Sequence, residues 1–376
     1  MFIKLLQSRP VLLAVILVLL GIAYAGQSGG ETMFDDDHQI IHVSAFSSAS
    51  DTFSVDFLGF FRPVKNLIFY TWVSLLPDQY PVWRLTAVAA FLGLIPITYL
   101  FFGLFWKKHP YLQLLSTALW ACAPAMTTVV SWISSTNILI GGYGFFLYFL
   151  WYEKARAQEQ SGHTGAAYAW KLSSLLMLAL ACFSYEAAVT APFLLGLKDC
   201  VLNQERLKEK RCWIHYGLSC FVLALYLLLR KIHGGVATFD IATTIPSDSD
   251  FWVSLSSGWM YLFHAIRWVW PFGHQGILIM FNPENHKILV VASAAVVLAI
   301  GVAGLFCIKR SPKVFLGVGW YAMALFPMAN VVPLRNGPIA DYYLFLPSIG
   351  LALLLSSLAK KLYESRQSWM GSAMGI

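Results

Sequence analysis

Charged residues are scarce in this sequence, at 12% of 376 residues, whereas a soluble domain carries about a quarter. Apolar residues make up 58% of the chain. This composition excludes an ordinary soluble globular protein and predicts a polytopic membrane protein. The net charge of +7 would suggest a nucleic-acid partner in a soluble protein. Here we attribute it to loops that face the cytoplasm, and we expect no nucleic-acid partner.

Cysteine is also rare, and no soluble stretch or internal repeat is evident. The six cysteines fall within apolar runs or in loops expected to be cytoplasmic, so no disulfide framework is predicted. We therefore expect one transmembrane domain over residues 1–376, with no separate soluble domain.

Long apolar runs predict an all-α bundle of about ten membrane spans. The first run, 10–25, ends in Ala23-Tyr24-Ala25, which resembles a signal-peptidase site; we favour an uncleaved span because apolar runs continue along the chain. A long run over 172–202, interrupted by Glu186, predicts two short spans with Glu186 at the turn. The other expected spans are 83–106, 111–130, one that follows the turn 131–137 and ends near Tyr152, 213–229, 288–307, 314–329 and 343–359.

Two larger segments lie between these spans. The first, 27–82, contains an Arg-Pro segment, 62–72, that predicts an amphipathic helix at the interface. The second, 230–286, contains an aromatic stretch, 252–270, that is interfacial or re-entrant. Placing both termini in the cytoplasm puts most of the 26 Lys and Arg residues inside and most of the 19 Asp and Glu residues outside. The positive-inside rule therefore predicts that both segments are extracytoplasmic, in a plasma or inner membrane.

An acidic cluster, Phe34-Asp35-Asp36-Asp37-His38, follows the first apolar run. Crowded carboxylates resist ionisation, so one of them is suited to act as a general base. The alternative is a solvated loop tip. A divalent-cation site built from Asp36, Asp37 and His38 also stays open, although consecutive residues seldom present convergent ligands. The pattern requires no other cofactor.

Further charged residues gather on the expected outer face. Charges at a membrane edge are costly, so a reaction at the water–lipid boundary would account for them. Arginine and lysine suit the binding of a departing phosphate. Without such a reaction, Arg62 and Lys65 would snorkel, Glu186 would cap a helix and Arg267 would be a cation–π anchor. The candidate substrate- or phosphate-binding residues are Arg62, Lys65, Glu186, Arg230, Lys231, Arg335 and Asp341.

Taken in order, five stretches resemble the GT-C class of integral membrane glycosyltransferases. The likeness is to the membrane part of tetratricopeptide-repeat O-mannosyltransferases and to bacterial polyprenyl-phosphate-sugar transferases. The fifth stretch is the most specific, because it is similar to an Asp-Arg-Tyr-Leu-Tyr-Leu-Pro-Ser-Ile-Gly element of that class. The stretches are Phe34-Asp35-Asp36, Arg62-Pro63-Val64, 123–135, Phe183-Ser184-Tyr185-Glu186 and 340–350.

This resemblance implies an inverting enzyme that takes a sugar from a polyprenyl-phosphate donor. The acceptor is a hydroxyl on a protein, lipid or glycan outside the cytoplasm. By position, Asp35 maps onto the catalytic base, with Asp36 as its rival, and Arg62 and Glu186 map onto the donor–acceptor cavity. Two departures remove positive charge, because Tyr185 and Tyr342 replace a family lysine and arginine. The alternatives are a lipid-linked-sugar transporter or flippase, an O-antigen polymerase or ligase, and a structural membrane subunit.

Overall fold

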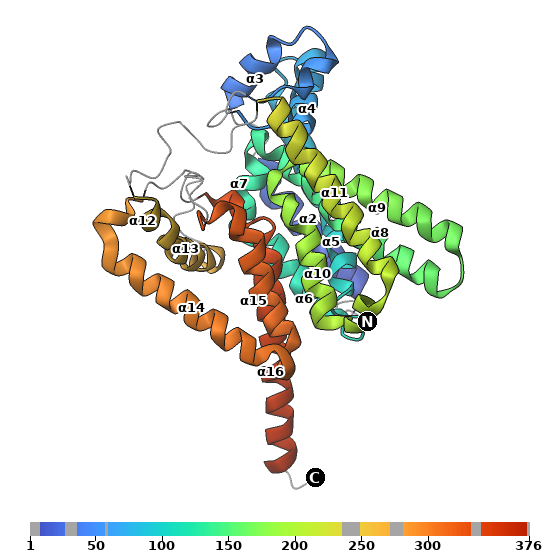
Figure 1. The fold of residues 1–376 in the computed structure, drawn as a ribbon, viewed down its shortest axis with the longest axis vertical. Helices are drawn as coiled ribbons and strands as arrows, with labels where there is room; N and C mark the ends of the chain where they lie inside the picture. The colour runs from blue at the N-terminus through green and yellow to red at the C-terminus, as the bar shows by residue number, and fades with distance from the viewer. Residues whose placement is uncertain are drawn as a thin grey trace.

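The computed structural model describes residues 8–26, 36–56, 59–234, 249–270, 281–331 and 340–373. Every secondary-structure element in these ranges is a helix, so the all-α expectation is confirmed for the described chain. Figure 1 shows a bundle whose α3 and α4 cap one end, while α16 extends from the other. We call these the cap end and the α16 end.

The N-terminal elements form one span-like helix and the cap. They are α2 (Arg9–Ala25), α3 (Asp36–Ser44), the 3-10 helix η2 (Ala49–Phe53) and α4 (Pro63–Leu75). The predicted helix after Arg62 is therefore present, with Pro63 in its first turn, where a missing N–H costs nothing. Phe69 and Trp72 of α4 pack with Trp83 in a small core of their own, and Trp72 and Trp83 stack at 5.3 Å.

The next elements contain two differences from the predicted spans. They are α5 (Tyr80–Gly103), α6 (Pro110–Ala121), α7 (Met126–Ser131), η3 (Ile133–Ser135) and α8 (Thr136–Gln160). The single span expected over 111–130 is wrong, because the helix breaks between α6 and α7. Pro124 lies in this break, lacks an N–H and disfavours helical geometry at Ala123. The helix expected to end near Tyr152 also differs, because α8 continues to Gln160.

The middle of the chain follows the prediction closely. Its elements are α9 (Thr164–Ser184), η4 (Glu186–Thr190), α10 (Ala191–Leu202), η5 (Gln204–Lys208) and α11 (Lys210–Ile232). The expected division of the long apolar run is confirmed, since Glu186 lies at the turn between α9 and α10.

The C-terminal elements complete the bundle. They are α12 (Asp250–Leu255), α13 (Ser257–Val269), η6 (Pro283–His286), α14 (Lys287–Arg310), α15 (Pro312–Leu325), η7 (Phe326–Met328), η8 (Asp341–Leu344) and α16 (Pro347–Ala373). The last span was predicted over 343–359. The helix α16 begins four residues later than this prediction, at Pro347, and ends later, at Ala373.

Five helices in the described chain are long and apolar enough to cross a membrane by length and composition. They cover Tyr80–Gly103, Ile133–Gln160, Thr164–Ser184, Lys210–Ile232 and Pro283–Arg310. Asn137 at the start of α8 donates to the carbonyl of Ser184 at 2.7 Å. Glu153 lies on the same helix, 16 residues after Asn137. This separation is about 24 Å along the helix axis, which is most of the thickness of a hydrocarbon core.

Glycine allows α8 and α9 to pack closely. A Cβ added at Gly144 would lie 2.6 Å from the carbonyl oxygen of Met177 and 2.7 Å from the amide nitrogen of Ala181, both backbone atoms of α9. Small residues at such positions let membrane helices approach each other.

We expect Gly144→Ala to separate the two helices and to destabilise the fold by about 1–3 kcal/mol. Gly217→Ala on α11 is the matched control, because nothing lies within 4 Å of an added Cβ there. This control should be neutral or stabilising, since alanine favours helices. Thermal unfolding of both purified variants measures the difference, and equal unfolding temperatures would contradict close packing at Gly144.

Candidate active site

The centre of the candidate site is an ion pair between Arg62 and Glu186, 124 positions apart in the chain. Arg62 precedes α4 and Glu186 begins η4, so the pair joins the cap to the bundle. Arg62 Nε donates to Glu186 Oε2 at 2.7 Å, and Arg62 Nη2 donates to Oε1. The side chains are 14% and 13% exposed. This bidentate geometry fixes both groups where water is largely excluded.

A second acid and a second base extend this pair. Asp56 is buried, and its Oδ2 lies 3.8 Å from Arg62 Nη1 and 3.7 Å from Lys65 Nζ. The backbone N–H of Phe60 donates to Asp56 Oδ1 at 2.9 Å. We call Arg62, Glu186, Asp56 and Lys65 the Arg62 cluster. Its charges balance as two cations and two carboxylates.

The electrostatics of the Arg62 cluster favour the ionised forms. Burial alone would raise the pKa of Glu186, but the Arg62 charge and its hydrogen bonds lower it overall. Burial would lower the pKa of Arg62, yet Glu186 raises it overall. Arg230, near the end of α11, is a further positive neighbour of Glu186. Glu186 is therefore a charged partner for cations and a poor general base.

Asp36 lies at the start of α3 and is fully buried. Its Oδ1 accepts a hydrogen bond of 2.8 Å from the backbone N–H of Ser134 in η3. One turn later, Gln39 Nε2 donates to Asn66 Oδ1 on α4 at 3.2 Å. These contacts hold Asp36 between the cap and the α7–α8 turn. The neighbouring Asp37 is exposed, and Asp35 lies outside the described residues.

Aromatic side chains adjoin the Arg62 cluster. Tyr342 is an electrostatic neighbour of Arg62, and its ring centroid lies 5.3 Å from that of Trp132. Tyr185 is buried, and its hydroxyl has no hydrogen-bond partner among the described residues. Tyr185 and Tyr342 thus contribute rings beside the cluster. Arg230 and Lys65 are the nearby cations of α11 and α4.

A second buried ion pair lies on α13 and η8. Arg267 Nε donates to Asp341 Oδ1 at 3.1 Å, and Nη2 donates to Oδ2 at 2.7 Å. Asp341, a predicted substrate-binding residue, is 2% exposed and pairs with Arg267. Of the remaining candidates, Lys231 is exposed near the end of α11, and Arg335 lies outside the described residues.

An apolar groove is lined in part by η4, the short helix that begins with Glu186. Its volume is about 660 Å³, and it lies between η4, the start of α10, α13 and the end of α15. Val189 and Thr190 line it and belong to η4. Val189 follows Glu186 by three residues, about one turn of η4 along the chain. Its other lining residues are Phe193, Tyr261, Ala322, Met323, Phe326 and Pro327.

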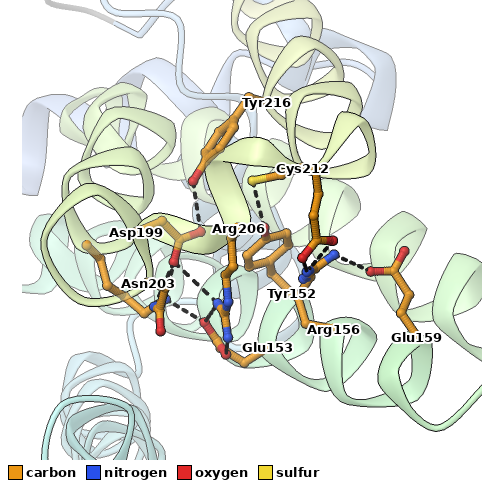
Figure 2. Close-up of polar contacts among 11 residues, drawn as sticks. Tyr152, Glu153, Arg156, Glu159, Asp199, Asn203, Arg206, Cys212 and Tyr216 are labelled. Atoms are coloured by element: carbon orange, nitrogen blue, oxygen red, sulfur yellow. Dashed lines mark hydrogen bonds and ion pairs between the residues drawn. The ribbon is translucent and has the colours of Figure 1, made fainter.

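The α16 end carries a different ionic network, shown in Figure 2. Arg206 of η5 donates to both carboxylate oxygens of Glu153 at 2.6 and 2.9 Å, and Asp199 of α10 accepts from Tyr216 of α11 at 3.0 Å. Arg156 contacts Glu159 and Glu209 at 2.6 and 2.7 Å. Because these groups pair with one another across α8, α10, η5 and α11, we assign the network a structural role.

The structure thus brings Arg62, Lys65 and Glu186 together, places Arg230 nearby and holds Asp36 at the same end. Asp56 and Arg267 were not among the predicted site residues. Asp56 lies in an irregular segment without periodicity, but its acidic side chain six positions before Arg62 was a usable signal. Among the described residues, no group of three or more His, Cys, Asp or Glu side chains could hold a metal ion.

No protein-family model, curated protein or solved structure matches this chain.

Proposed function

We propose that this protein is a membrane glycosyltransferase that moves a sugar from a polyprenyl-phosphate donor to a hydroxyl acceptor. One observation carries the proposal: η4 begins with Glu186 of a buried cluster of cations and carboxylates, and its last two residues line an apolar groove of about 660 Å³. A substrate with a long apolar chain and a charged head group suits such a site. A protein that only contacts membrane lipids would not need a buried ion pair with bidentate geometry, because charges at the membrane are costly.

In the proposed reaction, Asp35, with Asp36 as its rival, accepts the proton of the acceptor hydroxyl. The acceptor oxygen forms a bond to the anomeric carbon as the bond from that carbon to the phosphate oxygen breaks. The electron pair leaves with the polyprenyl phosphate, whose negative charge increases by one. We assign Lys65 and Arg230 the stabilisation of this charge, while Glu186 and Asp56 hold Arg62 in position. The active site is proposed to be extracytoplasmic.

The direct test incubates the purified protein with a polyprenyl-phosphate sugar labelled in the sugar. The expected result is release of free polyprenyl phosphate together with transfer of the label to a hydroxyl acceptor. If the donor instead stays intact and crosses the bilayer of a proteoliposome, the protein is a transporter and the proposal fails.

Filling the groove should discriminate between donors of different chain length. Ala322 lines the groove from α15, so Ala322→Trp would occupy part of it. Excluding two methylenes of the donor chain corresponds to about a tenfold increase in KM. A donor with only two isoprene units should show little change. Ala299→Trp, at an exposed position of α14, is the matched control. An equal effect on both donors would contradict the assignment of the groove.

A further inference from the structure

A basic pocket lies at the α16 end, away from the proposed active site. It has a volume of about 260 Å³ and is lined by residues from the end of α14, the start of α15 and α16. These three helices lie together at this end of the bundle (Figure 1). Its charged lining residues are Arg310, Lys313, Lys360, Lys361 and Glu364. Four cations thus share a small cavity with one carboxylate.

The geometry of Lys313 argues against simple snorkelling. A snorkelling lysine extends its ammonium group toward water. Lys313 Nζ instead lies 3.9 Å from the centroid of the Trp106 ring, which also lines the pocket. Lys361 donates a hydrogen bond to Ser311, the N-cap of α15, so α16 and the start of α15 are tied together at the pocket.

Charge in this pocket is incompletely balanced. Glu364 pairs with Lys360 at 3.2 Å on the surface of α16. Burial, together with the nearby Lys360, lowers the pKa of Lys313 to about 8. The N-terminus of α15 adds the positive end of a helix dipole. A bound anion would relieve the repulsion among these cations.

We infer that this pocket binds a phosphate group, supplied by an anionic phospholipid head group or by free phosphate. The size supports this class, because about 260 Å³ lies just below the range typical of drug-sized ligands. Basic pockets between helices on the cytoplasmic side of membrane proteins bind anionic lipid head groups. The charge distribution of the chain predicts that the α16 end faces the cytoplasm.

The test measures binding of phosphatidylglycerol to the full-length protein in phosphatidylcholine nanodiscs by titration. Removal of two pocket charges in Lys313→Gln/Lys360→Gln should weaken binding about tenfold or more. The control, Lys154→Gln/Lys208→Gln, removes two exposed charges from the same end outside the pocket. It should change binding less than about twofold, because exposed charges are screened. Equal weakening in both double variants, or none in the pocket variant, overturns the proposal.

Two further arms complete the experiment. If Lys313→Gln/Lys360→Gln does not fold, Arg310→Gln/Lys360→Gln replaces it, because Arg310 is exposed. The same weakening is expected, and wild-type binding overturns the proposal. Inorganic phosphate added as a competitor identifies the source. Displacement of the lipid supports a pocket that recognises phosphate alone, whereas retention supports a pocket that recognises the lipid head group.

Discussion

Asp36→Asn is expected to lower the rate of sugar transfer by about 100- to 10,000-fold, the usual contribution of a general base. Asn also has a carbonyl oxygen, so it retains an acceptor for the 2.8 Å hydrogen bond from the Ser134 amide. The variant loses the negative charge and with it the capacity to accept a proton. The readout is the rate of polyprenyl-phosphate release, measured beside thermal unfolding of the same sample.

Asp37→Asn provides the matched control for this prediction. Asp37 is the next residue of α3 and is exposed, so the variant changes the same charge without touching the buried position. It should retain the wild-type rate. Asp35→Asn separates the two candidate bases, since the resemblance maps the base onto Asp35 and makes Asp36 its rival. Wild-type rates in both Asp35→Asn and Asp36→Asn would remove the acidic cluster from the mechanism.

Most helices were predictable because uninterrupted apolar runs allow few other structures in a membrane. The errors have local and tertiary causes. Pro124 breaks the helix between α6 and α7, and this signal was readable in the sequence. The end of α8 was not readable, because Glu153 and Arg156 resemble loop residues. Arg206 and Glu209, from other elements, neutralise them in the fold.

Part of the candidate site could be predicted, namely the charged residues that the order of the spans assigns to the outer face. Arg62 and Glu186 each follow an apolar run and were expected to share an outer face, and the structure pairs them directly. The pairing of Asp341 with Arg267 was not predicted, because the two residues are 74 positions apart and each was assigned a different role. Three-dimensional contacts between distant loops determine such partners, and periodicity carries no information about them.

The Arg62–Glu186 pair should contribute a large coupling free energy to stability. Glu186→Gln leaves a guanidinium that is 14% exposed without its bidentate partner, and breaking a buried pair in this way costs about 3 kcal/mol or more. Arg62→Met should cost a similar amount. Replacing both residues, as Arg62→Met/Glu186→Leu, should be far less damaging than the sum of the single changes, because no uncompensated charge remains. Thermal or denaturant unfolding of the three variants measures the coupling.

The dependence on pH distinguishes an ion pair from simple packing. Because the pKa of Glu186 is lowered in the fold, its stabilising contribution is fully present above its ordinary value of 4.5. The contribution is lost as the pH falls through the lowered pKa, so Glu186→Gln should destabilise the protein at pH 7 and much less in strong acid. Glu205→Gln, which removes an exposed carboxylate paired with Lys208, should have little effect at either pH. A cost of Glu186→Gln that does not change with pH would show that shape, rather than charge, holds the cap to the bundle.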